Sequence, residues 1–342
     1  MRSMRIVVQV WGLIAVMPLC VGGCYINAGS WSQPHYERTV ELQHPMADGS
    51  TLAVSTASGS IDVTGQAVNE AQVVATIRGQ APTEEEAQEL AEQTEIRFEP
   101  SGERLAIKAD TPRLGHNRSV SVSYVITVPR QTSIDCGSAS GAIKATNLQG
   151  SVRADTASGS VTCEAVGGGE VRMGTASGSV RLSDAADLSS CEIKSSSGRA
   201  SADRVQATDR IRVSSTSGAV ELSDARARTI EMHGTSGHVS GRNIDCSRLT
   251  AECSSGQVSV EFSPSTPADV AAEVRSISGS VTVVAPPGFA GQVEMSTTSG
   301  SVHSDLPIQV QGRMNPRHLS GSIGTGNGSL SLRTTSGSVR LR

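Results

Sequence analysis

Five cysteines in the main part of the chain come first, because a thiol can bind a metal, form a disulfide or act as a nucleophile. They are Cys136, Cys163, Cys191, Cys246 and Cys253. No two of them have the Cys-x2–4-Cys spacing of a zinc site. Four stand at positions that alternate with polar residues and should be buried, whereas Cys246 falls in an expected interstrand loop. We predict buried structural thiols rather than a metal site, and an oxidising compartment would permit disulfides whose pairing the sequence leaves open.

The histidines are scattered along the chain. His233 and His238 stand at outward positions, so a two-ligand metal site is conceivable, but an ordinary solvated surface is the simpler interpretation. No Gly-x-Ser-x-Gly nucleophile motif stands beside a set of partner residues. The sequence therefore predicts no catalytic residue, no metal and no cofactor.

The aspartates give little support for a polysaccharide-cleaving enzyme, which needs converging carboxylates. Asp135, Asp155, Asp203 and Asp209 occupy different positions in their repeats. After removal of the N-terminal leader described below, Trp31 would be the only tryptophan, so an aromatic platform for sugar is missing. A carbohydrate-active enzyme remains the alternative function.

A Ser-Gly motif recurs through the chain, with an apolar and usually β-branched residue two positions after the glycine. Indexed on the glycine, the copies are Gly59, Gly141, Gly159, Gly178, Gly198, Gly218, Gly237, Gly256, Gly279, Gly300, Gly321 and Gly337. From Gly141 onward they lie 16 to 23 residues apart, a period typical of a solenoid. Glycine suits a sharp corner because such a bend commonly needs positive φ, which a β-carbon makes costly. We predict that all twelve are structural turn glycines.

Apolar and polar residues alternate on both sides of each glycine. Val161 and Val180 stand two positions after it, whereas Arg153 and Arg172 stand six before it. A period of two predicts strands with one face buried. The sequence thus predicts an all-β fold, a parallel β-solenoid with two short strands per coil. At about 4.8 Å per coil, the run from Gly141 to Gly337 would be roughly 48 Å long.

A row of hydroxyl side chains stands three positions before the glycines. It includes Thr56, Thr156, Thr175, Thr297 and Thr334. Threonine arrays are a feature of ice-binding solenoids, so ice binding is a third functional alternative. The row shares the parity of the apolar positions, and we therefore expect it to point inward.

The N-terminus has the features of a secretory leader. Arg2 and Arg5 precede an apolar run from Ile6 to Leu19, which is too short to cross a bilayer comfortably. The run is followed by Val21-Gly22-Gly23-Cys24, which resembles the lipobox of bacterial lipoproteins. That resemblance implies removal of residues 1–23 and lipidation of Cys24.

Acyl chains on Cys24 would hold the protein stably on a membrane. Tyr25 follows the cysteine where an aspartate could stand, so the resemblance favours the outer membrane if the host has two. Residues 24–37 show no clear period and are predicted to be a tether.

Gly59 and Gly141 are 82 residues apart, too far for a single coil. They contain strand-like segments and one helix-like segment, "PTEEEAQELAEQ", with Thr83 as its N-cap and Glu84–Glu86 at the positive end of the dipole. We predict that residues 38–130 form the first coil with a small α+β capping insertion, and that residues 131–342 form the solenoid.

Few residues follow the last motif. By the alternation, Val339 and Leu341 point inward while Arg340 and Arg342 point outward. We expect this last coil to be an open edge protected by the two arginines, and the protein to be monomeric.

The segments "LAVSTASGSIDVTG" and "VSVSYVITVPRQTSIDCGSASGAIKATNLQGSVRADTASGSV", separated by a helix-containing insertion, resemble a bacterial envelope family of unknown function. Its members are usually labelled putative adhesin. The resemblance covers roughly residues 38 to 342. It implies a right-handed parallel β-helix and brings no catalytic residues with it.

Charge excludes one class of partner. Loss of residues 1–23 removes two of the 29 basic residues and none of the 33 acidic ones, so the formal charge changes from −4 to −6. With aromatic residues at 2%, nucleic-acid binding is not expected. The sequence favours a non-catalytic, lipid-anchored protein of the cell envelope that serves as an adhesin or interaction scaffold, with an envelope protein or a glycan as partner.

Overall fold

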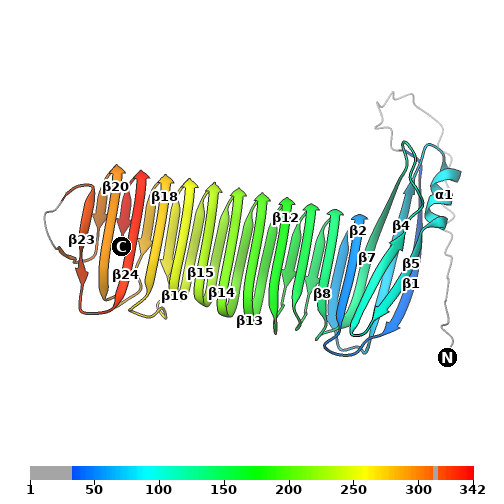
Figure 1. Cartoon of the computed structure of the whole chain (residues 1–342), viewed down its shortest axis with the longest axis horizontal. Helices are drawn as coiled ribbons and strands as arrows, with labels where there is room; N and C mark the ends of the chain where they lie inside the picture. Colours follow the sequence, from blue (N-terminus) through cyan, green and yellow to red (C-terminus); the bar gives the residue numbers. More distant parts are fainter. Residues whose placement is uncertain (1–32, 311–314) are drawn as a thin grey trace, which may run out of the picture.

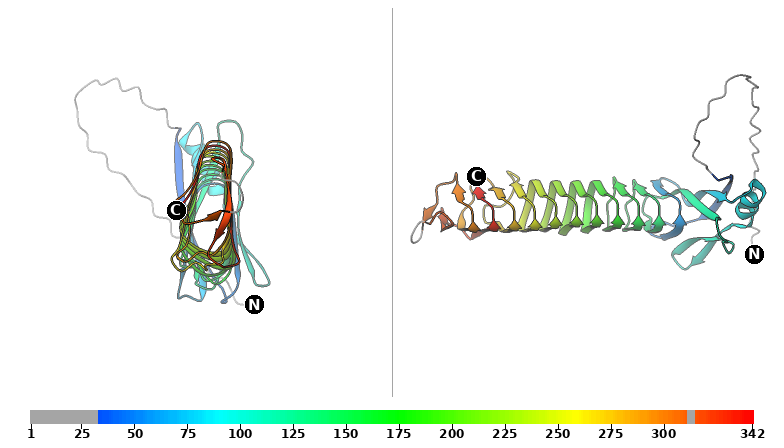
Figure 2. Two further views of the ribbon diagram at one scale, coloured as in Figure 1. Left: turned by 90° about the vertical axis from the view of Figure 1, so that its left-hand side faces the viewer. Right: turned by 90° about the horizontal axis from the view of Figure 1, so that it is seen from above.

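The protein is a long rod, a β-solenoid with a cap at its N-terminal end (Figure 1). The computed structural model describes residues 33–310 and 315–342, so the leader and Cys24 lie outside the described residues. Seen end-on, the coils are flattened loops stacked on one another (Figure 2). The prediction of an all-β parallel solenoid with a small α+β cap is confirmed.

Each coil has one strand before its glycine corner and one after it. The strands before the corners are β2 (Thr51–Ser58), β8 (Ser133–Ser140), β10 (Val152–Ser158), β12 (Glu170–Ser177), β18 (Ala271–Ser278), β20 (Gly291–Ser299) and β24 (Gly328–Ser336). The strands after them are β3 (Ile61–Gln66), β9 (Ile143–Thr146), β11 (Val161–Glu164), β17 (Val258–Phe262), β19 (Val281–Val284), β21 (Val302–Ser304) and β25 (Val339–Leu341). In the middle of the rod single strands run from one corner to the next: β13 (Val180–Ser197), β14 (Ala200–Ser217), β15 (Val220–Ser236) and β16 (Val239–Ser255).

Neighbouring coils stack in register, so equivalent residues face one another. In the β10–β12 pair, Val152 faces Val171 and Thr156 faces Thr175. The apolar rows fill the narrow space between the two strand rows, where Val161 is fully buried. Burial of a valine or leucine side chain contributes about 1.5–3 kcal/mol, so the alternating rows supply most of the cohesion.

The cap joins an antiparallel sheet to the first coil. Its elements are β1 (His35–Pro45), β4 (Glu70–Gln80), β5 (Glu95–Ser101), β6 (Arg104–Asp110), β7 (Ser119–Pro129) and α1 (Glu84–Gln93). β4 lies between β1 and β7 and is antiparallel to both, and β5 and β6 form a hairpin. β7 and β6 also pair in parallel with β3 and β2, which covers the open end of the first coil. β1 begins at His35, inside the segment predicted to be a tether.

The helix starts where the sequence predicts. Thr83 has an extended backbone and its side chain accepts a hydrogen bond from the Glu86 N–H at 3.3 Å. Acidic residues fill the first turn, which is favourable at the positive end of the helix dipole. Ala87 and Ala91 are fully buried, and α1 packs against β4 and β1.

The C-terminal coil is not the last coil of the stack. β24 lies between β18 and β20, parallel to both, and β25 lies between β19 and β21 (Figure 1). Gly337 therefore stacks between Gly279 and Gly300, the corners of the two parallel coils that come just before it in the sequence. The chain returns to this place through β22 (Gln309–Val310) and β23 (His318–Ile323), and β23 is antiparallel to β20.

Two sequence predictions are therefore wrong. Gly321 is not a corner, because it lies within β23 opposite Val293 of β20. The coil that contains Arg340 and Arg342 is not an open edge, because other coils pair with it on both sides. A local motif predicts a strand and its inward face, but it does not determine whether the strand stacks in parallel or folds back.

Candidate functional site

The remaining predicted corner glycines form a column along one edge of the rod. They are Gly59, Gly141, Gly159, Gly178, Gly198, Gly218, Gly237, Gly256, Gly279, Gly300 and Gly337, with φ between +124° and +156°. A β-carbon on Gly218 would press into the carbonyl oxygen of Gly198, and the same contact recurs along the column. Glycine is thus required for the close approach of successive coils as well as for φ, and only the second reason was available from the sequence.

The hydroxyl row points inward beside this column. Thr175 donates a hydrogen bond to the Gly159 carbonyl of the neighbouring coil at 3.0 Å, and Thr334 donates to the Gly279 carbonyl at 2.8 Å. Thr156, Thr175, Thr297 and Thr334 are all buried. These hydroxyls hold the coils together and are not available as a flat array for ice.

The residues just outside the corner form an exposed ridge. We call this the serine ridge: Ser58, Ser140, Ser158, Ser177, Ser197, Ser217, Ser236, Ser255, Ser278, Ser299 and Ser336. From Ser140 onward their carbonyl oxygens accept hydrogen bonds from the glycine column, as from Gly178 N–H to Ser197 at 2.9 Å. Their side chains face solvent, and Ile277 beside them is 60% exposed.

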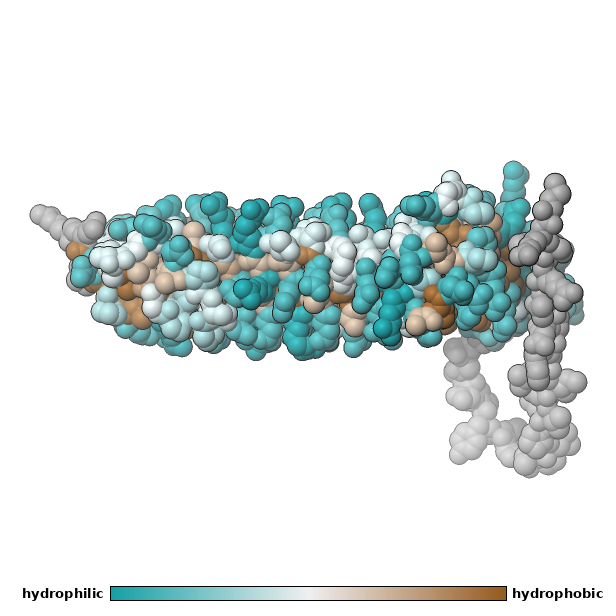
Figure 3. Space-filling model, turned by 90° about the horizontal axis from the view of Figure 1, so that it is seen from below, coloured by the Kyte–Doolittle hydropathy of each residue, from teal (hydrophilic) through white to brown (hydrophobic). Residues whose placement is uncertain are grey.

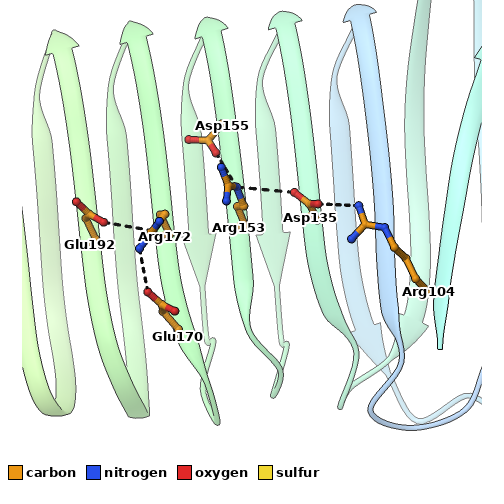
Figure 4. A network of polar contacts seen from close by, with 7 residues as sticks. All are labelled: Arg104, Asp135, Arg153, Asp155, Glu170, Arg172 and Glu192. Atoms are coloured by element: carbon orange, nitrogen blue, oxygen red, sulfur yellow. Dashed lines mark hydrogen bonds and ion pairs between the residues drawn. The ribbon is translucent and has the colours of Figure 1, made fainter. Parts of the chain in front are cut away.

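The flat face before the corner has a network of ion pairs across the coils (Figure 4). Asp135 lies 2.8 Å from Arg104 and 4.0 Å from Arg153, and Arg153 in turn lies 3.2 Å from Asp155. Exposed pairs of this kind contribute little stability, about 0–1 kcal/mol each. These pairs matter more for the surface potential, because neighbouring charges of opposite sign offset one another and leave no strong field of one sign.

The same network continues along the rod. Arg172 bridges Glu170 at 3.3 Å and Glu192 at 3.2 Å, as Figure 4 shows. Further on, Arg212 lies 3.6 Å from Glu231. We call this run of paired residues from Arg104 to Glu231 the charged face.

The four aspartates considered from the sequence do not converge. Asp135 and Asp155 belong to the charged face, whereas Asp203 pairs with Arg204 and Asp209 pairs with Arg228. Each carboxylate has a guanidinium beside it. The arrangement differs from the two facing carboxylates of a glycoside hydrolase.

A second corner lies six residues after the glycine and was not found from the sequence. Its non-glycine residues have positive φ: Asn147, Ala165, Asp184, Arg204, Asp224 and Asn243. Arg204 donates to both carboxylate oxygens of Asp184, at 2.6 and 2.9 Å, and this bonding lowers the pKa of Asp184. Asparagine and aspartate adopt this conformation more readily than most residues, so their recurrence here was the available signal.

The five cysteines are buried and free. Cys246 lies within β16 rather than in a loop, so its predicted position is wrong. Burial raises the pKa of Cys163 and of Cys246 to about 12, with Asp245 adding to the effect at Cys246. Burial also raises the pKa of Cys136, Cys191 and Cys253. A thiolate is the reactive form, so these thiols are poor nucleophiles and ligands.

The histidines lie on different faces. His233 is near Glu252 at 3.4 Å, and His238 is near Glu221 at 3.3 Å. Across residues 33–310 and 315–342, no three histidine, cysteine or acidic side chains are grouped so that they could hold a metal ion. No helix in the same ranges is long and apolar enough to cross a membrane.

A hollow of about 510 Å³ opens where the hydroxyl row is interrupted by Gly234. Its lining includes His233, Glu252, Arg275 and Ile277. On the side drawn in Figure 3, hydrophilic residues cover most of the rod. The hollow itself is open to solvent and is lined by both charged and apolar side chains.

A family model described as Toastrack DUF4097 matches residues 51–342. The chain belongs to this family. No curated protein matches the chain. The Toastrack match includes every coil of the solenoid and begins at β2, so it covers the whole stack described above.

Three solved structures are similar over most of the chain. A putative cell adhesion protein from Clostridium sporogenes is 11% identical with a TM-score of 0.27, covering 89% of this chain and 99% of its own. Putative adhesins from Bacteroides fragilis and Parabacteroides distasonis are 10% and 11% identical, with TM-scores of 0.33 and 0.41, each covering 89% of this chain and 97% of its own.

Proposed function

We propose that this protein is a non-catalytic, lipid-anchored component of the bacterial cell envelope that serves as an adhesin or interaction scaffold. In this account Cys24 holds the N-terminal end at a membrane, with the outer membrane favoured where there are two. The solenoid extends away from the anchor and contacts another macromolecule, either an envelope protein or a glycan.

The observation that carries the proposal is an unbroken stack of coils with the cap at one end. The cap begins at His35, a short way along the chain from Cys24, and the tip, meaning β20 to β25, lies at the opposite end (Figure 1). A rod of this form separates a surface from its anchor, which suits contact better than chemistry.

The use of polar side chains also supports binding over catalysis. Hydroxyls of the inward row hydrogen-bond to glycine carbonyls, the carboxylates of the charged face pair with arginines, and the thiols are buried. The hydroxyls and thiols therefore have structural roles, and each carboxylate of the charged face lies beside an arginine. The exposed serine ridge and charged face remain as the surfaces offered to a partner.

A pull-down from solubilised envelope, with the full chain as bait, tests the proposal. It should recover a specific macromolecule, and the same chain screened against envelope and extracellular glycans should show stoichiometric binding or none, without turnover. Release of sugar products would contradict the proposal and favour the carbohydrate-active alternative.

A further inference from the structure

The order of coils at the tip departs from the order of the sequence. Consecutive strands are usually neighbours in space. Here β24 and β25 enter between coils that were already complete in sequence order, and each must pair with a strand on both sides. Without them, the tip would contain a slot one coil wide with two unpaired parallel edges.

The bonds that hold the inserted coil are the general bonds of the solenoid. Gly279 N–H donates to the Ser336 carbonyl at 2.8 Å, and Gly337 N–H donates to the Ser299 carbonyl at 2.9 Å. Thr334 supplies the usual hydroxyl bond to Gly279. The inward-facing residues of the inserted coil have at most 1% of their surface exposed; they are Leu330, Leu332, Val339 and Leu341. An identical coil from another molecule would make every one of these contacts.

The link between the inserted coil and the rest of the tip is short and exposed. Residues 324–327, Gly-Thr-Gly-Asn, connect β23 to β24, and all four are exposed. β23 itself is held by its antiparallel pairing with β20. Short hinge loops of this kind favour domain swapping, in which identical elements are exchanged between protomers.

We propose that the C-terminal coil, residues 328–342, exchanges between two copies of this chain, so that each copy fills the slot in the other. The product is a dimer joined at the tips. Closed and exchanged forms differ chiefly in the conformation of residues 324–327, and the balance between them depends on protein concentration. The exchange itself does not depend on the proposed function. Its role as a contact between anchored molecules deepens the proposed function and rests on it.

One cysteine introduced on the surface of each of two separate copies can detect the exchange, because the five native cysteines of the solenoid are buried. Glu273 of β18 faces Ser331 of β24, and strands about 4.8 Å apart satisfy the Cα separation of a disulfide. One full chain with Glu273→Cys and another with Ser331→Cys are purified in detergent, mixed, concentrated, incubated and oxidised. The matched control mixes Glu192→Cys with Arg212→Cys, which face each other in the middle of the stack.

We expect several-fold more disulfide-linked heterodimer in the Glu273/Ser331 mixture than in the control, increasing with the concentration during incubation. Equal yields in the two mixtures would overturn the proposal, because exposed thiols would then be reacting by collision. A negative result would leave the pull-down and glycan experiments unaffected, so loss of the exchange and loss of the proposed function are distinguishable.

Discussion

Gly218 shows how little space a coil leaves at the corner. Its φ is +149°, and an added methyl group would meet the Gly198 carbonyl oxygen. We predict that Gly218→Ala lowers the free energy of unfolding by at least roughly 1–3 kcal/mol, the cost of a strained backbone conformation. Gly137→Ala is the matched control, because only the Ser55 β-carbon lies within 4 Å, at 3.9 Å. Urea unfolding curves measure both, and similar losses would contradict the stacked column.

Thr175 tests the hydroxyl row. Replacement by valine keeps the shape but removes the 3.0 Å hydrogen bond to Gly159. We predict a loss of about 1 kcal/mol in the free energy of unfolding. Thr162→Val, on the outward side of the neighbouring β11, should have less effect in the same urea experiment. A larger loss at Thr162 would mean that the row is not a stabilising element.

Cys163 gives a pH dependence whose sign follows from burial. Its pKa is raised from 9.0 to about 12 in the folded state. Above pH 9 the unfolded chain releases a proton that the folded chain keeps, so this thiol's stabilising contribution is complete below that pH and declines as pH rises toward 12. Under reducing conditions, unfolding measured at about pH 8 and about pH 10.5 should show a smaller decline in Cys163→Ala than in the unsubstituted chain. Identical declines would contradict the burial of this thiol.

At the scale of the element, β24 decides whether the C-terminal coil is internal. Leu332 is fully buried between the coils of β18 and β20. We predict that Leu332→Ala lowers the free energy of unfolding by about 2–5 kcal/mol. Ile277→Ala, at a position 60% exposed, should change it by less than about 0.5 kcal/mol. Comparable small losses in thermal or urea unfolding would indicate a loosely attached flap instead of an inserted coil.

The sequence predicted strands well and their order poorly, for a physical reason. The alternation that buries Val161 and Val180 is a property of a single strand, and the helix cap at Thr83 is equally local. The insertion of β24 and the reversal at β23 depend on which distant strand edge is available. Gly321 has the local motif of a corner but the pairing of a reversed strand, so the spacing of the Ser-Gly motifs could not distinguish it from the true corner glycines.

The site was predictable to a similar extent. Inward parity identified Thr175 and Cys163 as buried. It did not reveal the second corner at Asp184 and Arg204, where an ion pair between coils accompanies positive φ. The charged face as a continuous network was also beyond a single repeat, because pairs such as Arg172–Glu192 and Arg212–Glu231 join residues from different coils.

At the level of the whole molecule, the proposed attachment to a membrane depends on lipidation of Cys24. We predict that Cys24→Ser abolishes labelling by a fatty-acid probe and moves the protein from the membrane fraction to the soluble fraction, because acyl chains provide the membrane affinity. Metabolic labelling followed by fractionation measures both. Retention and labelling of the substituted protein would show that Cys24 is not the lipidated residue.

Photo-crosslinking in living cells tests whether the solenoid makes contact with another macromolecule away from the cap. A photoreactive residue is placed at Thr216 beside the serine ridge, at Thr325 in the tip, or at Glu103 in the β5–β6 turn of the cap, all exposed positions. We predict crosslinks to another macromolecule, a second copy included, from Thr216 or Thr325 and not from Glu103. Crosslinks from Glu103 alone, or from none of the three positions, would contradict it.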